Sequence, residues 1–278
     1  MNQQRPAFPI KLDSLSADKS KAKPVAAPAR PAVKAVPAKA SVQSQTPKNS
    51  PARVPTRPVT SQGLGMDSAA VRARMVQKLA QGGIQDAAVL KAMGAVERHR
   101  FVETALVNQA YEDTSLPIGL GQTISKPNVV ARMVELLRNG AAGKLGRVLE
   151  VGTGCGYQAA VLSHIATEVY SIERLKGLHE KARENVRGLR LHNVHLLFGD
   201  GMEGFAKGAP YAAIIAAAGG NDIPQPWLDQ LAVGGRLVAP MVTPAGHQAL
   251  VVVDRSAQGF RHQVLEAVHF VPLKSGIS

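Results

Sequence analysis

Three acidic residues, a glycine triplet and one serine are the residues of this 278-residue sequence whose types and spacing could do chemistry. Carboxylates accept hydrogen bonds from ribose hydroxyls, and a glycine-rich turn lets a ligand lie against the backbone. A serine at the start of a helix can hold an anion. These residues are Glu150, Glu173, Asp200, Gly152, Gly154, Gly156 and Ser125. Their combination favours a site for a nucleoside-type cofactor.

The glycine triplet lies in segment 147–166, which passes from a short apolar strand into an apolar helix. Its spacing departs from the dinucleotide pattern G-x-G-x-x-G, because Tyr157 stands where that pattern needs glycine. Glu150, just before the triplet, is poorly placed for a pyrophosphate but suits the cationic aminoacyl group of S-adenosylmethionine. We expect this cofactor to lie against exposed N–H groups of the loop. A tight turn without a ligand is the alternative.

The three acids each follow a predicted strand. Glu150 ends the strand before the triplet, Glu173 follows strand 168–172, and Asp200 follows strand 193–198. In a doubly wound parallel sheet the carboxyl ends of the strands line one crevice, so we expect the three carboxylates there. Glu173 has the spacing of a ribose-binding acid. Asp200 could accept from an adenine amino group or from neighbouring backbone.

Ser125 precedes Lys126 and Pro127 at the start of an amphipathic helix that reaches Leu137. This position predicts that Ser125 is the N-cap. A hydroxyl and free N–H groups at a helix N-terminus also suit an anion. Capping alone would explain the serine, so both interpretations remain open from its position.

The other segments give the elements that must position these residues. Two helices are predicted within 71–102, and segment 111–124 is expected to be loop-like. Strands and helices then alternate, which predicts an α/β, doubly wound, mostly parallel sheet. Two apolar segments, 249–255 and 264–273, have no helix between them and predict an antiparallel pair at the sheet edge.

The formal net charge of +13 is concentrated at the N-terminus, where residues 1–66 hold eleven Lys and Arg against two acids. Residues 1–65 also hold ten prolines and few large apolar side chains, so we expect a disordered basic extension before a domain at 66–278. The remainder is only mildly basic, with few aromatic residues. This argues against a specific nucleic-acid reader, while weak contact between the extension and a polyanion remains open.

A single cysteine, Cys155, excludes an internal disulfide and a cysteine-based metal cluster. It lies in the glycine loop, where we interpret it as a packing residue. No apolar run is long enough to span a membrane, and residues 1–10 lack the apolar stretch of a secretory signal. We therefore expect a cytoplasmic protein. His99, which lies beside two arginines, is interpreted as a surface residue.

The sequence from about Met66 to Leu273 resembles the protein-L-isoaspartate (D-aspartate) O-methyltransferase family. The resemblance rests on YEDTSLPIGLGQTISKP, VLEVGTGCGYQAAVLS, the Glu173 and 199–201 positions, IPQPWLDQL, GGRLVAPM and the late FVPL. The first motif is typical of this family in particular, whereas many methyltransferases share the glycine loop.

The resemblance implies a Rossmann-like repair methyltransferase. Such an enzyme transfers the methyl group of S-adenosylmethionine to the free α-carboxylate of an L-isoaspartyl residue in damaged proteins and peptides, without a metal. The implied catalytic residue is Ser125, and the implied substrate-binding residues are Thr123, Ile124, Ser125, Val271 and Leu273. The implied cofactor-binding residues are Glu150, Gly152, Thr153, Gly154, Gly156, Glu173, Asp200 and Gly201.

Two positions depart from the family pattern. Many relatives have Gln at the position of Lys126, and an aromatic residue at that of Met202. Neither departure removes an implied role. Two other functions remain open: a methyltransferase of the same fold with another acceptor, and a non-catalytic binding protein that uses the basic extension.

Overall fold

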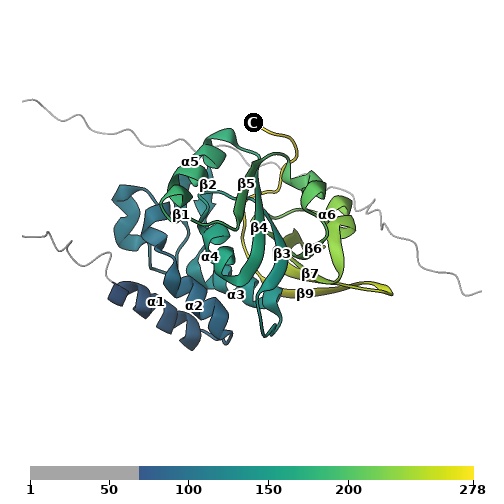
Figure 1. The fold of residues 1–278 in the computed structure, drawn as a ribbon, viewed down its shortest axis with the longest axis horizontal. Helices are drawn as coiled ribbons and strands as arrows, with labels where there is room; N and C mark the ends of the chain where they lie inside the picture. Colours follow the sequence, from purple (N-terminus) through teal and green to yellow (C-terminus); the bar gives the residue numbers. More distant parts are fainter. Residues whose placement is uncertain (1–68) are drawn as a thin grey trace, which may run out of the picture. The chain divides into compact units, whose positions relative to one another are not determined.

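The computed structural model describes residues 69–278. The predicted extension, residues 1–65, lies outside these described residues, as does the start of the predicted domain at Met66. The described part is built around a seven-stranded sheet with helices on both faces (Figure 1). The strands of this sheet are β3 (Leu145–Val151), β4 (Ala166–Glu173), β5 (Val194–Phe198), β6 (Tyr211–Ala216), β7 (Leu231–Val242), β8 (Gln248–Ser256) and β9 (Gly259–Ala267).

The strand order is β5-β4-β3-β6-β7-β8-β9, with β3 to β7 parallel and the last two pairings antiparallel. The predicted α/β class, the parallel sheet and its antiparallel edge are therefore confirmed. The chain order reverses on either side of β3, because β4 lies on one side and β6 on the other. Ligands bind at such a switch point, outside the carboxyl ends of the strands.

The helices are α1 (Ala69–Gln81), α2 (Ala87–Ala95), α3 (Pro127–Arg138), α4 (Tyr157–Ile165), α5 (Lys176–Arg187) and α6 (Gln225–Gln230). Short 3-10 turns are η1 (Arg98–Phe101), η2 (Thr104–Gln109), η3 (Gly201–Glu203) and η4 (Ala206–Gly208). Figure 1 shows α6 on the other side of the sheet from α1 to α4. The two helices predicted within 71–102, the helix predicted to reach Leu137 and the helix predicted after the glycine triplet are all present.

Alternating side chains of the strands build two cores. Val148 packs with residues of α1 to α5 on one face, and its neighbour Leu149 packs with Trp227 of α6 on the other. The same alternation runs through β6, where Ile215 and Ile214 divide between the two faces. A strand buried on both faces reads as a continuous apolar run, which is why these short runs predicted strands.

The segment before α3 corrects two expectations. The region predicted as a loop contains a hairpin of β1 (Leu116–Gly119) and β2 (Gln122–Ile124). Its Pro and Gly residues obscured the alternation of apolar and polar side chains that predicts a strand. Ser125 is not the N-cap of α3. That position is Lys126, without a side-chain cap, while Asp113 Oδ1 accepts a 2.8 Å hydrogen bond from the Asn128 N–H.

The last segment also differs from its prediction, which extended a strand from 264 to 273. β9 ends at Ala267, and the chain then turns across the carboxyl end of the sheet. There the Gly219 N–H donates to the Val271 carbonyl oxygen, and the Leu273 N–H donates to that of Gly219, both at 2.8 Å. These bonds fix Val271 and Leu273 above the strand ends.

Candidate active site

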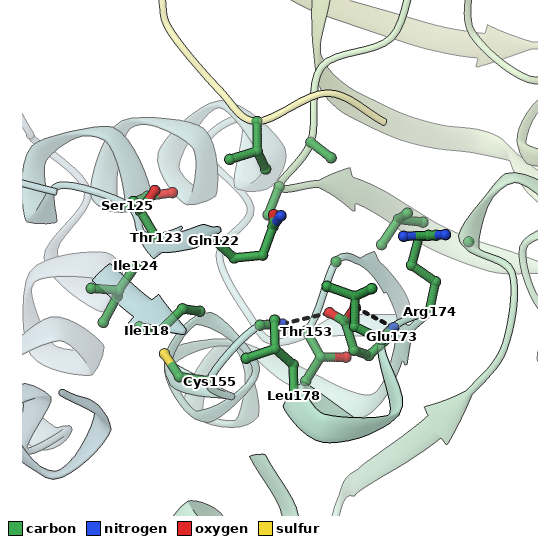
Figure 2. Close-up of a pocket in the computed structure, with 18 of the residues that line it drawn as sticks. Ile118, Gln122, Thr123, Ile124, Ser125, Thr153, Cys155, Glu173, Arg174 and Leu178 are labelled. Atoms are coloured by element: carbon green, nitrogen blue, oxygen red, sulfur yellow. Dashed lines mark hydrogen bonds between the residues drawn. The ribbon is translucent and has the colours of Figure 1, made fainter. Parts of the chain in front are cut away.

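A cavity of about 450 Å³ lies at the carboxyl ends of β3, β4 and β6. Most of its wall comes from the β1–β2 hairpin, the glycine loop, the start of α5 and the C-terminal segment, and Gly201, Ala217 and Ala218 add to the lining after β5 and β6. Figure 2 shows Thr123 and Ser125 across the opening from Glu173 and Arg174. The volume is in the range of small-molecule sites.

The predicted site residues divide into those that line this cavity and those that do not. All five predicted substrate residues line it, and so do five of the cofactor residues: Gly152, Thr153, Gly154, Glu173 and Gly201. Glu150, Gly156 and Asp200 are not among the lining residues. The expectation that three carboxylates share one crevice therefore holds for Glu173 alone.

The glycine loop is held by its own N–H groups. Gly152 N–H donates to the Ile172 carbonyl oxygen at 2.9 Å, and Gly154 N–H donates to Glu173 Oε2 at 2.9 Å. Gly156 N–H donates to the Thr153 carbonyl oxygen at 2.9 Å. These three N–H groups are not exposed to a ligand, contrary to our expectation. The glycines instead supply positive φ angles of 91°, 56° and 89°, which shape the loop.

Glu173 connects the loop to the start of α5. It is 5% exposed, and its second carboxylate oxygen accepts a 2.9 Å hydrogen bond from the Leu175 N–H. Each oxygen retains a lone pair, because a carboxylate can accept about four hydrogen bonds. Glu173 therefore both stabilises the loop and presents a carboxylate to the cavity.

Glu150 lies beneath the loop with no exposed surface. Its carboxyl group accepts a hydrogen bond from the Ser171 hydroxyl, which is itself 2.6 Å from Thr153 Oγ1. Burial raises the pKa of Glu150 to about 8, although the Ser171 hydrogen bond acts in the opposite direction. Glu150 is therefore largely protonated at neutral pH. This position supports the loop and does not offer a charge to a cationic aminoacyl group.

Asp200 uses both carboxylate oxygens within the protein. Oδ1 accepts a 2.9 Å hydrogen bond from the Met202 N–H, and Oδ2 accepts one from the Gly276 N–H of the C-terminal segment. The sequence left two hydrogen-bond donors open for Asp200, an adenine amino group or neighbouring backbone. The structure shows backbone N–H donors. Gly201 lies against the cavity floor, where an added Cβ would be only 2.5 Å from Val151 Cγ1.

The main chain of Ser125 is fixed by a hydrogen bond from Arg98, a residue that the sequence analysis did not identify. The Arg98 side chain has no exposed surface; its Nη2 donates to the Ser125 carbonyl oxygen at 2.7 Å and its Nε to that of Ala110 at 2.8 Å. The guanidinium carbon lies 4.7 Å from the ring centre of Tyr157. Arg98 thus joins the Ser125 segment to the start of α4.

The structure can be compared with the interpretations of Cys155 as a packing residue and of His99 as a surface residue. Burial raises the pKa of the Cys155 thiol to about 11, so the thiolate needed for a nucleophile is scarce at neutral pH, as expected for a packing residue. His99 is half-buried rather than a surface residue, and its Nδ1 lies 2.7 Å from the Tyr111 hydroxyl.

The lining residues fit a nucleoside-type methyl donor. The floor is a glycine turn that leaves room beside the backbone, and one buried carboxylate, Glu173, faces the cavity where a ribose diol needs acceptors. Ile118, Ile172 and Leu178 supply apolar surface for a base. Fold and site together define a Rossmann-like methyltransferase.

Comparisons with known proteins identify the family. The family model described as protein-L-isoaspartate(D-aspartate) O-methyltransferase matches residues 70–278. The chain therefore belongs to this family, whose members are S-adenosylmethionine-dependent methyltransferases. The family, enzyme class and cofactor expected from the sequence are confirmed.

Individual relatives agree with this result. The protein-L-isoaspartate O-methyltransferase of Methylibium petroleiphilum is 56% identical over 279 residues, which is 98% of either chain. That of Leptothrix cholodnii is 58% identical over 240 residues, 84% of either chain.

Two solved structures share the fold. One, a protein-L-isoaspartate O-methyltransferase, has a TM-score of 0.67 at 27% identity, and covers 74% of this chain and 67% of its own. A second structure, from Plasmodium falciparum and in complex with S-adenosyl-L-homocysteine, has a TM-score of 0.65 at 24% identity. The match covers 73% of this chain and 98% of the Plasmodium chain.

Within residues 69–278, no helix is long and apolar enough to cross a membrane. The same residues contain no group of three or more His, Cys, Asp or Glu side chains that could hold a metal ion.

Proposed function

We propose that the cavity is divided between the two substrates of an L-isoaspartyl methyl transfer. The chain transfers the methyl group of S-adenosylmethionine to the free α-carboxylate of L-isoaspartyl residues in damaged proteins and peptides. The observation that supports the division is the position of Ser125 and Thr123 across one continuous cavity from Glu173 and the glycine loop (Figure 2).

On the cofactor side, Glu173 would accept hydrogen bonds from the ribose, while Gly152, Thr153, Gly154 and Gly201 would form the surface below it. Glu150, Gly156 and Asp200 would act from outside the cavity. Glu150 and Gly156 support the loop, and Asp200 anchors the C-terminal segment. S-adenosylmethionine supplies a methyl group that its sulfonium activates.

On the acceptor side, Ser125 would hold the carboxylate oxygen that does not attack. The Ser125 hydroxyl has no hydrogen-bond partner of its own among residues 69–278, and the residue is only half-buried, so it is available. An α-carboxylate is ionised at neutral pH and already nucleophilic, so no general base is required. Thr123, Ile124, Val271 and Leu273 would border the peptide. Rate enhancement then comes from orientation and from exclusion of water.

The free N–H groups that the sequence analysis expected at the start of α3 contribute little to this site. Pro127 has no N–H, and the Asn128 N–H already donates to Asp113. The proposed contact with the carboxylate therefore rests on the Ser125 hydroxyl, which lines the cavity.

The test compares two peptides of identical sequence, one with an isoaspartyl link and one with a normal aspartyl link, in the presence of S-adenosylmethionine with a labelled methyl group. The normal side-chain carboxylate lies one methylene further from the main chain and should miss the in-line position. We expect label in the isoaspartyl peptide and almost none in its twin. Equal labelling of the two peptides, or cofactor binding without methylation of the isoaspartyl peptide, would contradict the proposed methyl acceptor.

Residues 1–65 carry a separate proposal. Their basic, proline-rich composition supports a disordered extension before a methyltransferase domain at 66–278, and weak contact with a polyanion. Limited proteolysis of the full chain should cut this segment first. Exchanging its Lys and Arg residues for Gln should abolish retention on heparin at low salt. Retention that survives this exchange contradicts the contact. We also place the enzyme in the cytoplasm, from its single cysteine, which cell fractionation would check.

A further inference from the structure

A second cavity, of about 330 Å³, adjoins the first on its acceptor side. Both cavities are lined by Thr123, Ser125, Ala217 and Val271. The second continues past Ser115 and the start of α3 to the segment after β9. A peptide whose reacting carboxylate lies at Ser125 therefore has a neighbouring space of side-chain size for the residue beside it.

The ionisable side chains that line this second cavity are basic. They are Lys126, at the N-cap position of α3, and His269, and no carboxylate is among the lining residues. Lys126 forms no ion pair with any other described residue. Positive charge from the N-terminal end of the α3 dipole adds to that of Lys126.

Acids on the flanking segments are already engaged. Asp113 accepts the Asn128 N–H, and Glu266 accepts a 2.8 Å hydrogen bond from Arg132 Nε. Neither lines the cavity. The lining of the cavity therefore contributes the Lys126 ammonium group and no carboxylate.

We propose that the second cavity binds the side chain of a residue adjacent to the isoaspartyl residue, and that Lys126 makes it select a carboxylate there. The preferred acceptors are then isoaspartyl sites flanked by Asp or Glu. This inference rests on the proposed function, because it places the isoaspartyl carboxylate at Ser125. Gln at position 126 would occupy a similar space without the charge.

The size of the effect follows from exposure. Lys126 and His269 are both exposed, so water and salt screen their charges. We expect a glutamate peptide to exceed its glutamine twin in kcat/KM by about two- to fivefold, the range for an exposed ion pair. The preference should shrink as ionic strength rises.

The experiment uses the full chain and isoaspartyl peptides that carry Glu, Gln or Lys directly before or directly after the isoaspartyl residue. The quantity compared is the ratio of kcat/KM for the Glu peptide to that for the Lys peptide. In the wild-type enzyme this ratio should exceed one at one of the two positions. It should approach one in Lys126→Gln and fall below one in Lys126→Glu.

Lys91→Gln is the matched control, because it removes the same charge from an exposed site on α2 that lines neither cavity. This variant should keep the wild-type ratio. A wild-type ratio near one at both positions, or a ratio that Lys126→Glu leaves unchanged, overturns the proposal. Because all of these peptides are isoaspartyl, their equal methylation would reject only the charge selection, whereas no methylation of any peptide would reject the proposed function.

Discussion

The Arg98 guanidinium donates a 2.7 Å hydrogen bond to the main-chain carbonyl oxygen of Ser125, although the two residues are 27 positions apart in the sequence. The same side chain holds the Ala110 carbonyl oxygen and lies over the Tyr157 ring. A planar guanidinium can satisfy several fixed acceptors at once, which an ammonium cannot do with the same geometry. The position of Ser125 therefore depends on a buried guanidinium outside the cavity.

Replacing Arg98 by Lys should lower kcat/KM for an isoaspartyl peptide by about 10- to 100-fold, the cost of displacing a reacting group by about 1 Å. The loss should appear in kcat and in the peptide KM, while affinity for S-adenosylhomocysteine stays near the wild-type value. The free energy of unfolding should also fall, by about 1–3 kcal/mol for a buried acceptor left unpaired.

Arg72→Lys separates positioning from stability. Arg72 Nε donates to the Gly94 carbonyl oxygen at 2.8 Å and its guanidinium pairs with Glu97, whereas within residues 69–278 no hydrogen bond joins Arg72 to Ser125. This variant should lose stability but retain the peptide kinetics. If the two variants lose activity in proportion to their loss of stability, Arg98 has no separate role in positioning Ser125.

Glu173→Ala should weaken S-adenosylhomocysteine binding by about 2–3 kcal/mol, the scale of hydrogen bonds to a charged acceptor. The variant also frees the N–H groups of Gly154 and Leu175, so the loop loses an anchor. Isothermal titration calorimetry measures the affinity. Glu168→Ala is the control, because Glu168 lies at the other end of β4 and pairs with His195 on the surface. Unchanged affinity in folded Glu173→Ala would place the ribose elsewhere.

Glu150 should make stability depend on pH. Its folded pKa of about 8 lies above the ordinary value of 4.5, so the unfolded chain releases the proton first as pH rises. The contribution of Glu150 to the free energy of unfolding is complete below pH 4.5 and is lost between pH 4.5 and 8, by up to about 1.4 kcal/mol per pH unit.

Urea unfolding at pH 5, 6, 7 and 8 would measure this dependence. Glu150→Gln carries no titrating group, so its stability should fall less steeply over this range than that of the wild type. Glu203→Gln, which removes an exposed acid, should follow the wild-type slope. Parallel slopes for wild type and Glu150→Gln would mean that Glu150 is ionised in the folded protein.

The sheet could be predicted because each central strand is buried on both faces and therefore appears as a short apolar run, as in 211–216. The site was predicted only in part. Sequence position placed Glu150 and Asp200 near the strand ends, but it could not show that Ser171 donates to one oxygen of Glu150 and Gly276 to one oxygen of Asp200. The role of Arg98 could not be predicted, because the sequence does not distinguish a buried arginine from a surface arginine. The distinction requires the carbonyl groups that the side chain binds.

Ser125→Ala is the substitution that tests the acceptor side directly. Because Lys126 is the N-cap of α3 and the Ser125 side chain caps nothing, removing the hydroxyl should not unfold the start of the helix. Loss of a single oxyanion-type donor lowers turnover by about two to three orders of magnitude, and we expect this variant to lose about one to three. Affinity for S-adenosylhomocysteine should stay near wild type, since Glu173 and the glycine loop lie across the cavity. Ser256→Ala, which removes a hydroxyl from the exposed end of β8, is the control and should keep full turnover. A fully active Ser125→Ala enzyme would leave the carboxylate to another donor in the cavity.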